Sequence, residues 1–575
     1  MEVAEVPDGQ VCAHAFANTS VNASPVQFAI RRGGVFVNEY ARLSSDGKHS
    51  NGGTDDPNHL LGAFPVLFPY GEGGFEVGRV QAVSYETHAR WALQYSDRHF
   101  RKDLHFVFQV FGVLQKRAVC RAACLQIKRA TFTRHQAAIQ SLTPTDLMNA
   151  SREEARKMRF SNPAVQHLRQ HLTAVRSKVM GTDESRHNIC SQIWGLTVAF
   201  NPPSLWITIN PSDTNDPIAQ VMTGQSIDLD SFVKTAGPEG SDRAIAIASD
   251  PYAAAKFFHF IIRKILSCLF GIEPSAKQNQ ICQKKGVLGT VAAYVGAVEA
   301  QGRGTLHLHL VLWLVGAPTA DAMKEALRSD AFRDKVVRYI SRVIRADLDG
   351  GDATAITKIP KERAVSYSRP CDPRQANYGQ RRDAAEKILA RSVQVHACTR
   401  NSCLVPVKGR MQCKRRAPFA LSPTDWIQED GSWGPKRTFG YLNNWNPVLL
   451  QVIRANHNIK LITNGAETKD IAWYITNYAT KKQQRSGNAS ALLATRLAFH
   501  QSQEKTNSNL AELNRRLIQR CANTLSREQE FSAPEVISYI MGWGDRYISH
   551  SFTSIYTDPL FYALRRQYPQ LRLKR

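Results

Sequence analysis

The chain lacks long apolar runs and a phosphate-binding loop. No apolar stretch approaches the roughly 18 residues that a membrane-spanning helix needs, which argues against a helical membrane protein. The opening residues, MEVAEVPDGQ, contain no apolar h-region, so they predict no secretory signal. The pattern G-x-x-x-x-G-K-[ST] is also missing, which excludes a nucleotide-driven motor of that type in this sequence. We therefore expect an intracellular protein without a membrane partner.

Acidic residues are scarce relative to basic ones. The 575 residues include 74 Lys and Arg but only 49 Asp and Glu, which gives a formal charge of +25 at pH 7. Such an excess predicts a polyanionic partner, and nucleic acid is the commonest one. A generally basic protein without such a partner is the alternative. The hydrophobic content of 43% is sufficient for two to four domains with cores of their own.

The eleven cysteines are odd in number and scattered, which favours reduced thiols in an intracellular protein. One stretch, VHACTRNSCLVPVKGRMQC (395–413), gathers three of them around a histidine. The thiol and imidazole groups predict a structural Zn²⁺ site, and unligated buried thiols are the alternative. The candidate zinc ligands are His396, Cys398, Cys403 and Cys413. The basic residues that follow are candidate DNA contacts or a solvated face: Lys414, Arg415 and Arg416.

We expect an α+β fold with a central antiparallel β-sheet, flanking helices and the paired histidines described below on a middle strand. Hydrophobic periodicity predicts helices in 144–180, divided by Pro163, and over 251–270 and 319–347. The predicted strands are 193–200, 205–210 and a hairpin of 289–301 with 304–314. The expected domains are an N-terminal domain (1–135), a basic helical connector (136–190), a core (191–347), an insertion with the zinc site (348–440) and a final part of the core with C-terminal helices (441–575).

Basic and aromatic residues alternate in HARWALQYSDRHFRKDLHFVFQVFGVLQKR (88–117), within the expected N-terminal domain. A basic surface of this kind supplies phosphate contacts in DNA-binding proteins. The candidate DNA contacts are Arg90, Arg98, Arg101 and Lys102. Phe106, Phe108 and Phe111 are expected to fill a core instead.

The stretch GTLHLHLVLWL (304–314) places leucine at every second position and two histidines between them. Since successive side chains of a strand point to opposite faces, His307 and His309 share one face, about 7 Å apart along the strand. Across the hairpin, either Glu299 or Gln301 is placed to complete a ligand set. Two imidazoles and one oxygen with open positions predict a catalytic metal site. Hydrogen-bonded strand histidines without metal are the alternative.

Two tyrosines lie four residues apart in NGAETKDIAWYITNYATKK (464–482). On a helix, Tyr474 and Tyr478 share a face, and Lys481 lies on the same side. A phenol has a pKa near 10, so it becomes a useful nucleophile only with help from a cation. The alternative is a helix or strand that simply buries both rings.

Together these motifs resemble the HUH endonucleases, and in particular the Rep domain of Helitron rolling-circle transposases. The resemblance lies in VEAQGRGTLHLHLVLWL followed by IAWYITNYATKK, with further similarity in PNHLLGAFPVLFPYGEGGFE (57–76), PPSLWITINPSD (202–213) and YLNNWNPVLLQVIRANHNIKLI (441–462). It extends over most of the chain from 57 to about 560. The family also has a His/Cys patch between its two Rep motifs, which adds to the zinc prediction.

The resemblance implies His307 and His309 as ligands of Mg²⁺ or Mn²⁺, with Glu299 as first choice and Gln301 as second choice for the third ligand. Tyr474 and Tyr478 would be nucleophiles that nick single-stranded DNA and form 5′-phosphotyrosine links. Where the family often has lysine before the second tyrosine, this chain has Asn477, and Lys481 and Lys482 are the nearest cations.

The implied partners are single-stranded DNA, transposon ends and a helicase module on the same or another chain, and the implied location is the nucleus. A catalytically inactive DNA-binding module is the main alternative. A phosphoesterase with two H-x-[ST] motifs ranks last, because His171-Leu-Thr173 supplies one motif and His307-Leu-His309 does not supply the second.

Overall fold

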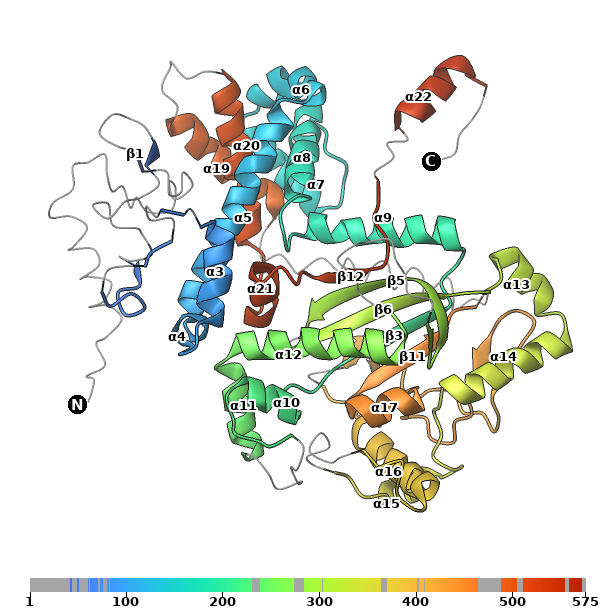
Figure 1. Ribbon diagram of the computed structural model, residues 1–575. Helices are drawn as coiled ribbons and strands as arrows, with labels where there is room; N and C mark the ends of the chain where they lie inside the picture. The colour runs from blue at the N-terminus through green and yellow to red at the C-terminus, as the bar shows by residue number, and fades with distance from the viewer. Residues whose placement is uncertain are drawn as a thin grey trace.

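The computed structural model describes residues 42–43, 49–50, 60, 63–70, 73–75, 80–81, 83–229, 238–272, 284–301, 304–362, 370–400, 403–407, 409–463, 488–503, 510–553 and 558–570. The expected α+β class is confirmed: helices surround a main antiparallel sheet (Figure 1). The described residues also form three two-stranded sheets: β1 (Arg42–Leu43) with β2 (His49–Ser50), β7 (Leu404–Val407) with β8 (Arg410–Cys413), and β9 (Trp426–Ile427) with β10 (Trp433–Gly434). None of the described helices is long and apolar enough to cross a membrane.

The main sheet has the strand order β11-β3-β6-β5-β12, and every pairing in it is antiparallel. Its strands are β3 (Leu205–Ile209), β5 (Gly289–Ala300), β6 (Leu306–Leu314), β11 (His457–Leu461) and β12 (Arg546–Ile548), with the short β4 (Lys285–Gly286) added to β5. The predicted strand at 205–210 and the predicted hairpin therefore form. β6 is the middle strand, so the histidines have a pairing partner on each side.

The two faces of the sheet are covered by different helices. Helix α12 (Pro251–Lys264) and the π-helical turn η1 (Ile265–Leu269) pack on the leucine face, where four of the five leucines of β6 are buried. Each buried leucine contributes on the order of 2 kcal/mol through removal of apolar surface from water. Helix α9 (Asp183–Phe200) packs on the opposite face, which we call the histidine face (Figure 1).

The prediction of a strand at 193–200 is wrong, because these residues form the second half of α9. The helix begins earlier, where the Thr182 side chain accepts a hydrogen bond from the Ser185 N–H and acidic residues occupy the first turn. Ile189, Ile193 and Leu196 then recur at helical spacing and pack on the sheet. The β-branched composition of this segment is overridden by its start signal and by packing.

A helical bundle with a second core lies beside the sheet (Figure 1). It contains α6 (Ala130–Gln140), α7 (Pro144–Ala155), α8 (Pro163–Arg176), α19 (Ala489–Gln503) and α20 (Leu510–Arg527). The predicted division at Pro163 is confirmed, since Asn162 caps α8 and Pro163 occupies its first turn. Helix α5 (Leu104–Ile127) joins the two cores: its first half packs toward the sheet and its second half packs into the bundle.

The expected domain boundary at residue 135 falls inside α6, and the C-terminal α19 and α20 complete a bundle formed by earlier helices. The predicted helix at 319–347 is two helices, α13 (Ala320–Ala326) and α14 (Asp330–Val343). The remaining elements are α3 (Tyr85–Gln94), α4 (His99–Lys102), α10 (Pro217–Met222), α11 (Gly240–Ala248), α15 (Ala353–Lys358), α16 (Tyr378–Val393), α17 (Pro447–Ile453), α21 (Ala533–Ile540) and α22 (Asp558–Gln567).

A buried histidine ties the sheet to its helices and predicts acid sensitivity. His259 of α12 hydrogen-bonds the Tyr547 hydroxyl at 2.6 Å and the Ser538 hydroxyl at 2.9 Å, and burial lowers its pKa from 6.5 to about 3. Between these two pKa values His259 is protonated in the unfolded chain and neutral in the folded chain. The free energy of unfolding therefore falls as the pH drops below 6.5. Between pH 7 and pH 5 the protonation of His259 should lower the free energy of unfolding by about 2 kcal/mol. Urea unfolding at the two pH values should therefore show a smaller pH dependence for His259→Gln than for wild type.

Candidate metal centres

The hairpin of β5 and β6 brings Glu299, His307 and His309 together on the histidine face. Glu299 lies directly opposite His307 in the register, and His309 follows two residues later on the same side. The two Nε2 atoms are 2.9 Å apart, and Glu299 Oε2 lies 3.4 Å from each of them. We call these three residues the histidine cluster. Both imidazoles are buried and the carboxylate is nearly so.

Contacts behind the cluster orient one ring. The Thr208 hydroxyl of β3 lies 3.1 Å from His309 Nδ1. When Nδ1 carries the proton and donates it to this hydroxyl, the Nε2 lone pair faces Glu299 and His307. Sequence reasoning missed Thr208, although it lies in LWITIN on the same alternation as Trp206, whose ring stacks 6.1 Å from His309.

The charge states in the cluster suit a cation. Burial alone raises the pKa of Glu299, but hydrogen bonds and charge from the two histidines outweigh burial and bring that pKa well below its usual range. Burial lowers the pKa of His309, against the opposing effect of the Glu299 carboxylate. Two ring nitrogens and a carboxylate oxygen at these separations repel one another unless a proton or a metal cation lies among them.

The distances fit a divalent ion. Octahedral ligands at about 2.1 Å from Mg²⁺ are about 3 Å apart along each edge, close to the separations in the histidine cluster. Glu299, His307 and His309 form a possible metal-binding group by mutual distance. Gln301, the second choice for the third ligand, donates its Nε2 to Asn210 Oδ1 at 2.8 Å.

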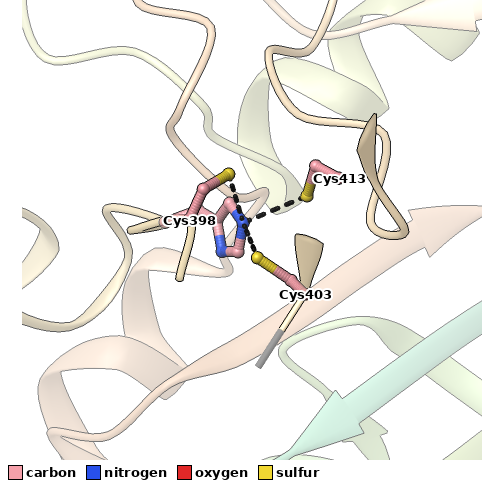
Figure 2. Close-up of side chains that lie close together, drawn as sticks. Cys398, Cys403 and Cys413 are labelled. Atoms are coloured by element: carbon pink, nitrogen blue, oxygen red, sulfur yellow. Dashed lines mark hydrogen bonds between the residues drawn. The ribbon is translucent and has the colours of Figure 1, made fainter. Parts of the chain in front are cut away.

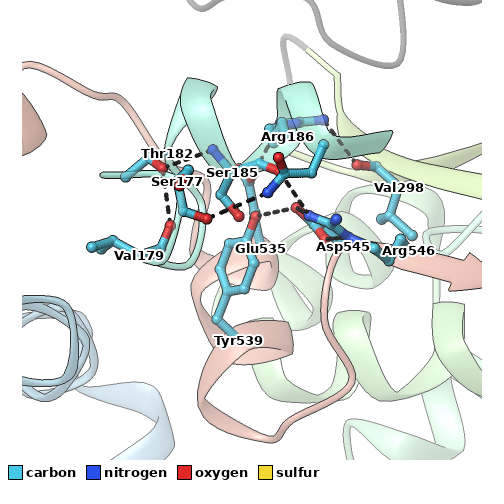
Figure 3. Close-up of polar contacts among 11 residues, drawn as sticks. Ser177, Val179, Thr182, Ser185, Arg186, Val298, Glu535, Tyr539, Asp545 and Arg546 are labelled. Atoms are coloured by element: carbon cyan, nitrogen blue, oxygen red, sulfur yellow. Dashed lines mark hydrogen bonds and ion pairs between the residues drawn. The ribbon is translucent and has the colours of Figure 1, made fainter. Parts of the chain in front are cut away.

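A buried ionic network supports β5 beside the cluster (Figure 3). Arg186 of α9 donates to the Val298 carbonyl at 3.1 Å and pairs with Glu535 of α21 at 3.5 Å. Next to this pair, the Tyr539 hydroxyl donates to Asp545 at 3.1 Å. Burial raises the pKa of Glu535 to about 7. Burial acts to lower the pKa of Arg186, but the facing Tyr539, Glu535 and Asp545 together outweigh burial and raise that pKa. The network fixes the strand position next to Glu299 against two helices, and sequence reasoning missed it together with the start of α9.

The second group gathers three sulfur atoms around one imidazole (Figure 2). His396 Nε2 lies 3.3 Å from the sulfurs of Cys398 and Cys413 and 3.5 Å from that of Cys403. Tetrahedral zinc ligands, with S at about 2.3 Å and N at about 2.0 Å from the metal, lie about 3.5 Å apart. The four residues thus form a possible metal site compatible with structural zinc. We call them the zinc cluster.

Backbone pairing holds the zinc cluster in place. The hairpin of β7 and β8 brings Cys413 opposite Leu404, the neighbour of Cys403. The His396 N–H donates to the Tyr441 carbonyl at 2.7 Å, which attaches the cluster to the chain leading into α17. Burial, followed by the neighbouring thiols, raises the pKa of Cys398 to about 11, so without a cation this thiol stays protonated. A bound zinc ion would reverse this, because a coordinating thiol is deprotonated.

The basic residues predicted to contact DNA are placed differently from one another. Arg101 is buried and pairs with Asp250 at 2.6 Å, so its guanidinium does not face solvent. The prediction that Arg101 contacts a DNA phosphate is therefore wrong. Arg90 donates to the Ile540 carbonyl at 3.0 Å and Arg98 donates to the Thr223 carbonyl, so both dock the first helices onto the core. Lys102 is exposed.

The remaining candidates lie after the zinc cluster or outside the described residues. The three basic residues that follow the cluster are exposed: Lys414, Arg415 and Arg416. The tyrosine segment and its lysines lie in 464–487, outside the described residues: Tyr474, Tyr478, Lys481 and Lys482. The described chain enters this segment after β11, the strand paired with β3, and resumes at Asn488, whose side chain donates to the Ser151 carbonyl of α7.

Comparison with known families identifies one related region. Residues 88–312 match the model of the Helitron helicase-like domain at the N-terminus. The match begins in α3 and ends in β6, so it includes the whole histidine cluster and stops before the zinc cluster. This region is therefore related to the N-terminal part of Helitron transposases. No curated protein matches the chain.

Proposed function

We propose that this protein nicks single-stranded DNA and transfers the cut strand, as the Rep part of a Helitron-type rolling-circle transposase. The observation that carries the proposal is the histidine cluster. Two imidazoles and one carboxylate converge on the middle strand of an antiparallel sheet, within a region related to Helitron transposases. The net charge of +25 supports a nucleic-acid substrate.

The histidine cluster would hold Mg²⁺ or Mn²⁺ through Glu299 Oε2 and the Nε2 atoms of the two histidines. A divalent ion there would polarise the scissile phosphate and offset the charge that develops on its oxygens. Thr208 fixes the His309 ring, and the ionic network around Arg186 fixes β5. These contacts keep the ligand atoms in position before DNA arrives.

The proposed nucleophiles are Tyr474 and Tyr478, with Lys481 favouring the phenolate. The phenol oxygen forms a bond to phosphorus, the bond from phosphorus to the 3′ oxygen breaks, and the proton lost by the phenol is balanced by protonation of the 3′ oxygen. One phosphodiester replaces another, so religation to a new 3′-OH needs no ATP. Two tyrosines allow two DNA ends to be held during strand transfer.

The proposal implies partners and a location. Transposon ends are the expected DNA, a helicase module on the same or another chain would supply single strands, and the nucleus is the expected compartment. The exposed basic residues after the zinc cluster would contact DNA phosphates, which would add salt-dependent affinity.

Covalent capture of DNA tests the nucleophiles. A labelled single-stranded oligonucleotide with Mn²⁺ should form a protein–DNA adduct with wild type, Tyr474→Phe and Tyr478→Phe, and the adduct should vanish only in the double variant. Each single variant keeps one phenol, whereas the double variant keeps none. Denaturing gels measure the adduct.

Tyr562→Phe is the matched control, because Tyr562 is an exposed tyrosine of α22 outside both clusters. It should form adduct at the wild-type level. Absence of adduct in wild type with either Mg²⁺ or Mn²⁺, while the oligonucleotide still binds, would favour an inactive DNA-binding module.

A further inference from the structure

Three side-chain amides form a hydrogen-bonded row across the strand ends of the sheet, next to Glu299 and His307. Gln301 Nε2 donates to Asn210 Oδ1 at 2.8 Å, and Asn210 Nδ2 donates to Asn456 Oδ1 at 3.1 Å. We call these three residues the amide row. Gln301 follows β5, Asn210 follows β3 and Asn456 precedes β11, so the row crosses three strand ends.

The amide row lies on the histidine face. Thr208 contacts His309, so its side chain points to that face. Asn210 lies two residues after Thr208, directly beyond the end of β3, where its N–H still pairs with the Asn456 carbonyl, and side chains two residues apart in an extended chain share a face. Gln301 stands in the same relation to Glu299. The row therefore borders the histidine cluster.

The row is anchored at one end and open at the other. Asn456 Nδ2 donates to the Val393 carbonyl at 2.8 Å and to Gln394 Oε1 at 3.1 Å, and the Asn210 N–H donates to the Asn456 carbonyl at 3.0 Å. Asn210 and Asn456 are half-buried, whereas Gln301 is exposed. Among the described residues Gln301 uses one side-chain N–H within the row, so its Oε1 and its second N–H are available to a ligand.

The chemistry of the exposed end selects the ligand. A phosphate offers only acceptors and is gripped best by cations, and the row contains none. The edge of a nucleobase offers donors and acceptors side by side, which an amide matches with its own N–H and C=O. We propose that the amide row reads the identity of one base of single-stranded DNA beside the scissile phosphate. Gln301 makes the contact, and Asn210 and Asn456 act as positioning residues.

This inference rests on the proposed function, because the histidine cluster defines where the scissile phosphate lies. The competing explanation is that the row only joins strand ends. The two differ in base preference, which a purely structural row would not affect.

Gln301→Met separates them, since it removes the amide, keeps the length of the side chain and lies at an exposed position. Wild type and variant are incubated with Mn²⁺ and a pool of single-stranded oligonucleotides with a randomised segment, and the cut ends are sequenced. Wild type should prefer one base near the cut by on the order of tenfold. The variant should lose that preference at one position and keep it elsewhere, with unchanged Mn²⁺ affinity.

Gln140→Met is the matched control, because Gln140 is an amide of α6 that bonds Asn514 in the helical bundle. It should keep the wild-type preference at every position. Asn210→Leu should weaken the same single preference as Gln301→Met, because it removes the partner that orients Gln301. An identical preference in wild type and Gln301→Met at every position would overturn the inference.

Failure of the proposed function gives a different result. Wild type would then neither bind Mn²⁺ at the histidine cluster nor cut the pool. The oligonucleotides retained on a filter would still test the row: a base preference lost in Gln301→Met supports base reading by Gln301, and an unchanged one rejects it.

Discussion

Substitution of either histidine of the cluster should abolish DNA cleavage. His307→Ala and His309→Ala each remove one of three ligand atoms that lie within 3.4 Å of one another. Metal ions supply several kcal/mol of charge stabilisation in such reactions, so cleavage should fall by about 10³-fold or more. Glu299→Gln keeps the shape but removes the charge, and it should weaken Mn²⁺ binding by at least about tenfold. Calorimetry measures the binding, and gel assays measure the cleavage.

His135→Gln is the control for these variants. His135 is a half-buried histidine of α6 that contacts His171 in the helical bundle. It should cut DNA and bind Mn²⁺ as wild type does. Zinc content should stay constant throughout, which separates the histidine cluster from the zinc cluster. Full cleavage by His309→Ala would rule out a metal at this position.

The histidine cluster could be predicted because strand alternation is a local property. The leucines at 306–314 predict a strand, its period of two puts His307 and His309 together, and a short turn puts Glu299 opposite. The choice between Glu299 and Gln301 could not be made in this way. It depends on distances in the folded chain, where Glu299 Oε2 lies 3.4 Å from both histidine Nε2 atoms. Gln301 instead donates a hydrogen bond to Asn210, which lies 91 residues earlier in the sequence.

Other features depended on contacts between distant segments. Arg101 has the appearance of a DNA contact in sequence, but Asp250 lies 149 residues away and neutralises it in the interior. The strand predicted at 193–200 ignored the start signal at Thr182, and with it Arg186 and its partner Glu535. Local composition predicts which side chains are polar, whereas the fold decides which of them face each other.

Loss of one zinc ligand should unfold the loop around the zinc cluster and leave the central sheet intact. Cys403 is the most buried of the three thiols, and Cys403→Ser should lower zinc from about one equivalent per chain to less than half. In small zinc-dependent folds the metal contributes on the order of 10 kcal/mol. None of the residues of β7 and β8 is buried, so the hairpin has little apolar packing of its own. Metal analysis and hydrogen exchange of 403–413 measure the two effects.

The unfolding of the loop in Cys403→Ser should not extend to α16, because that helix packs in a separate hydrophobic core. Leu389 and Ala390 pack with Trp445 without any contribution from the metal, and the Trp445 indole Nε1–H donates to Glu386 Oε1 at 3.0 Å. Exchange in β6 should therefore be unchanged in Cys403→Ser, and Mn²⁺ binding at the histidine cluster should persist. Cys268→Ser is the control, since Cys268 is an exposed thiol outside the cluster. Wild-type protein with less than half an equivalent of zinc would contradict the zinc assignment, and faster exchange in β6 would contradict the separation of the two sites.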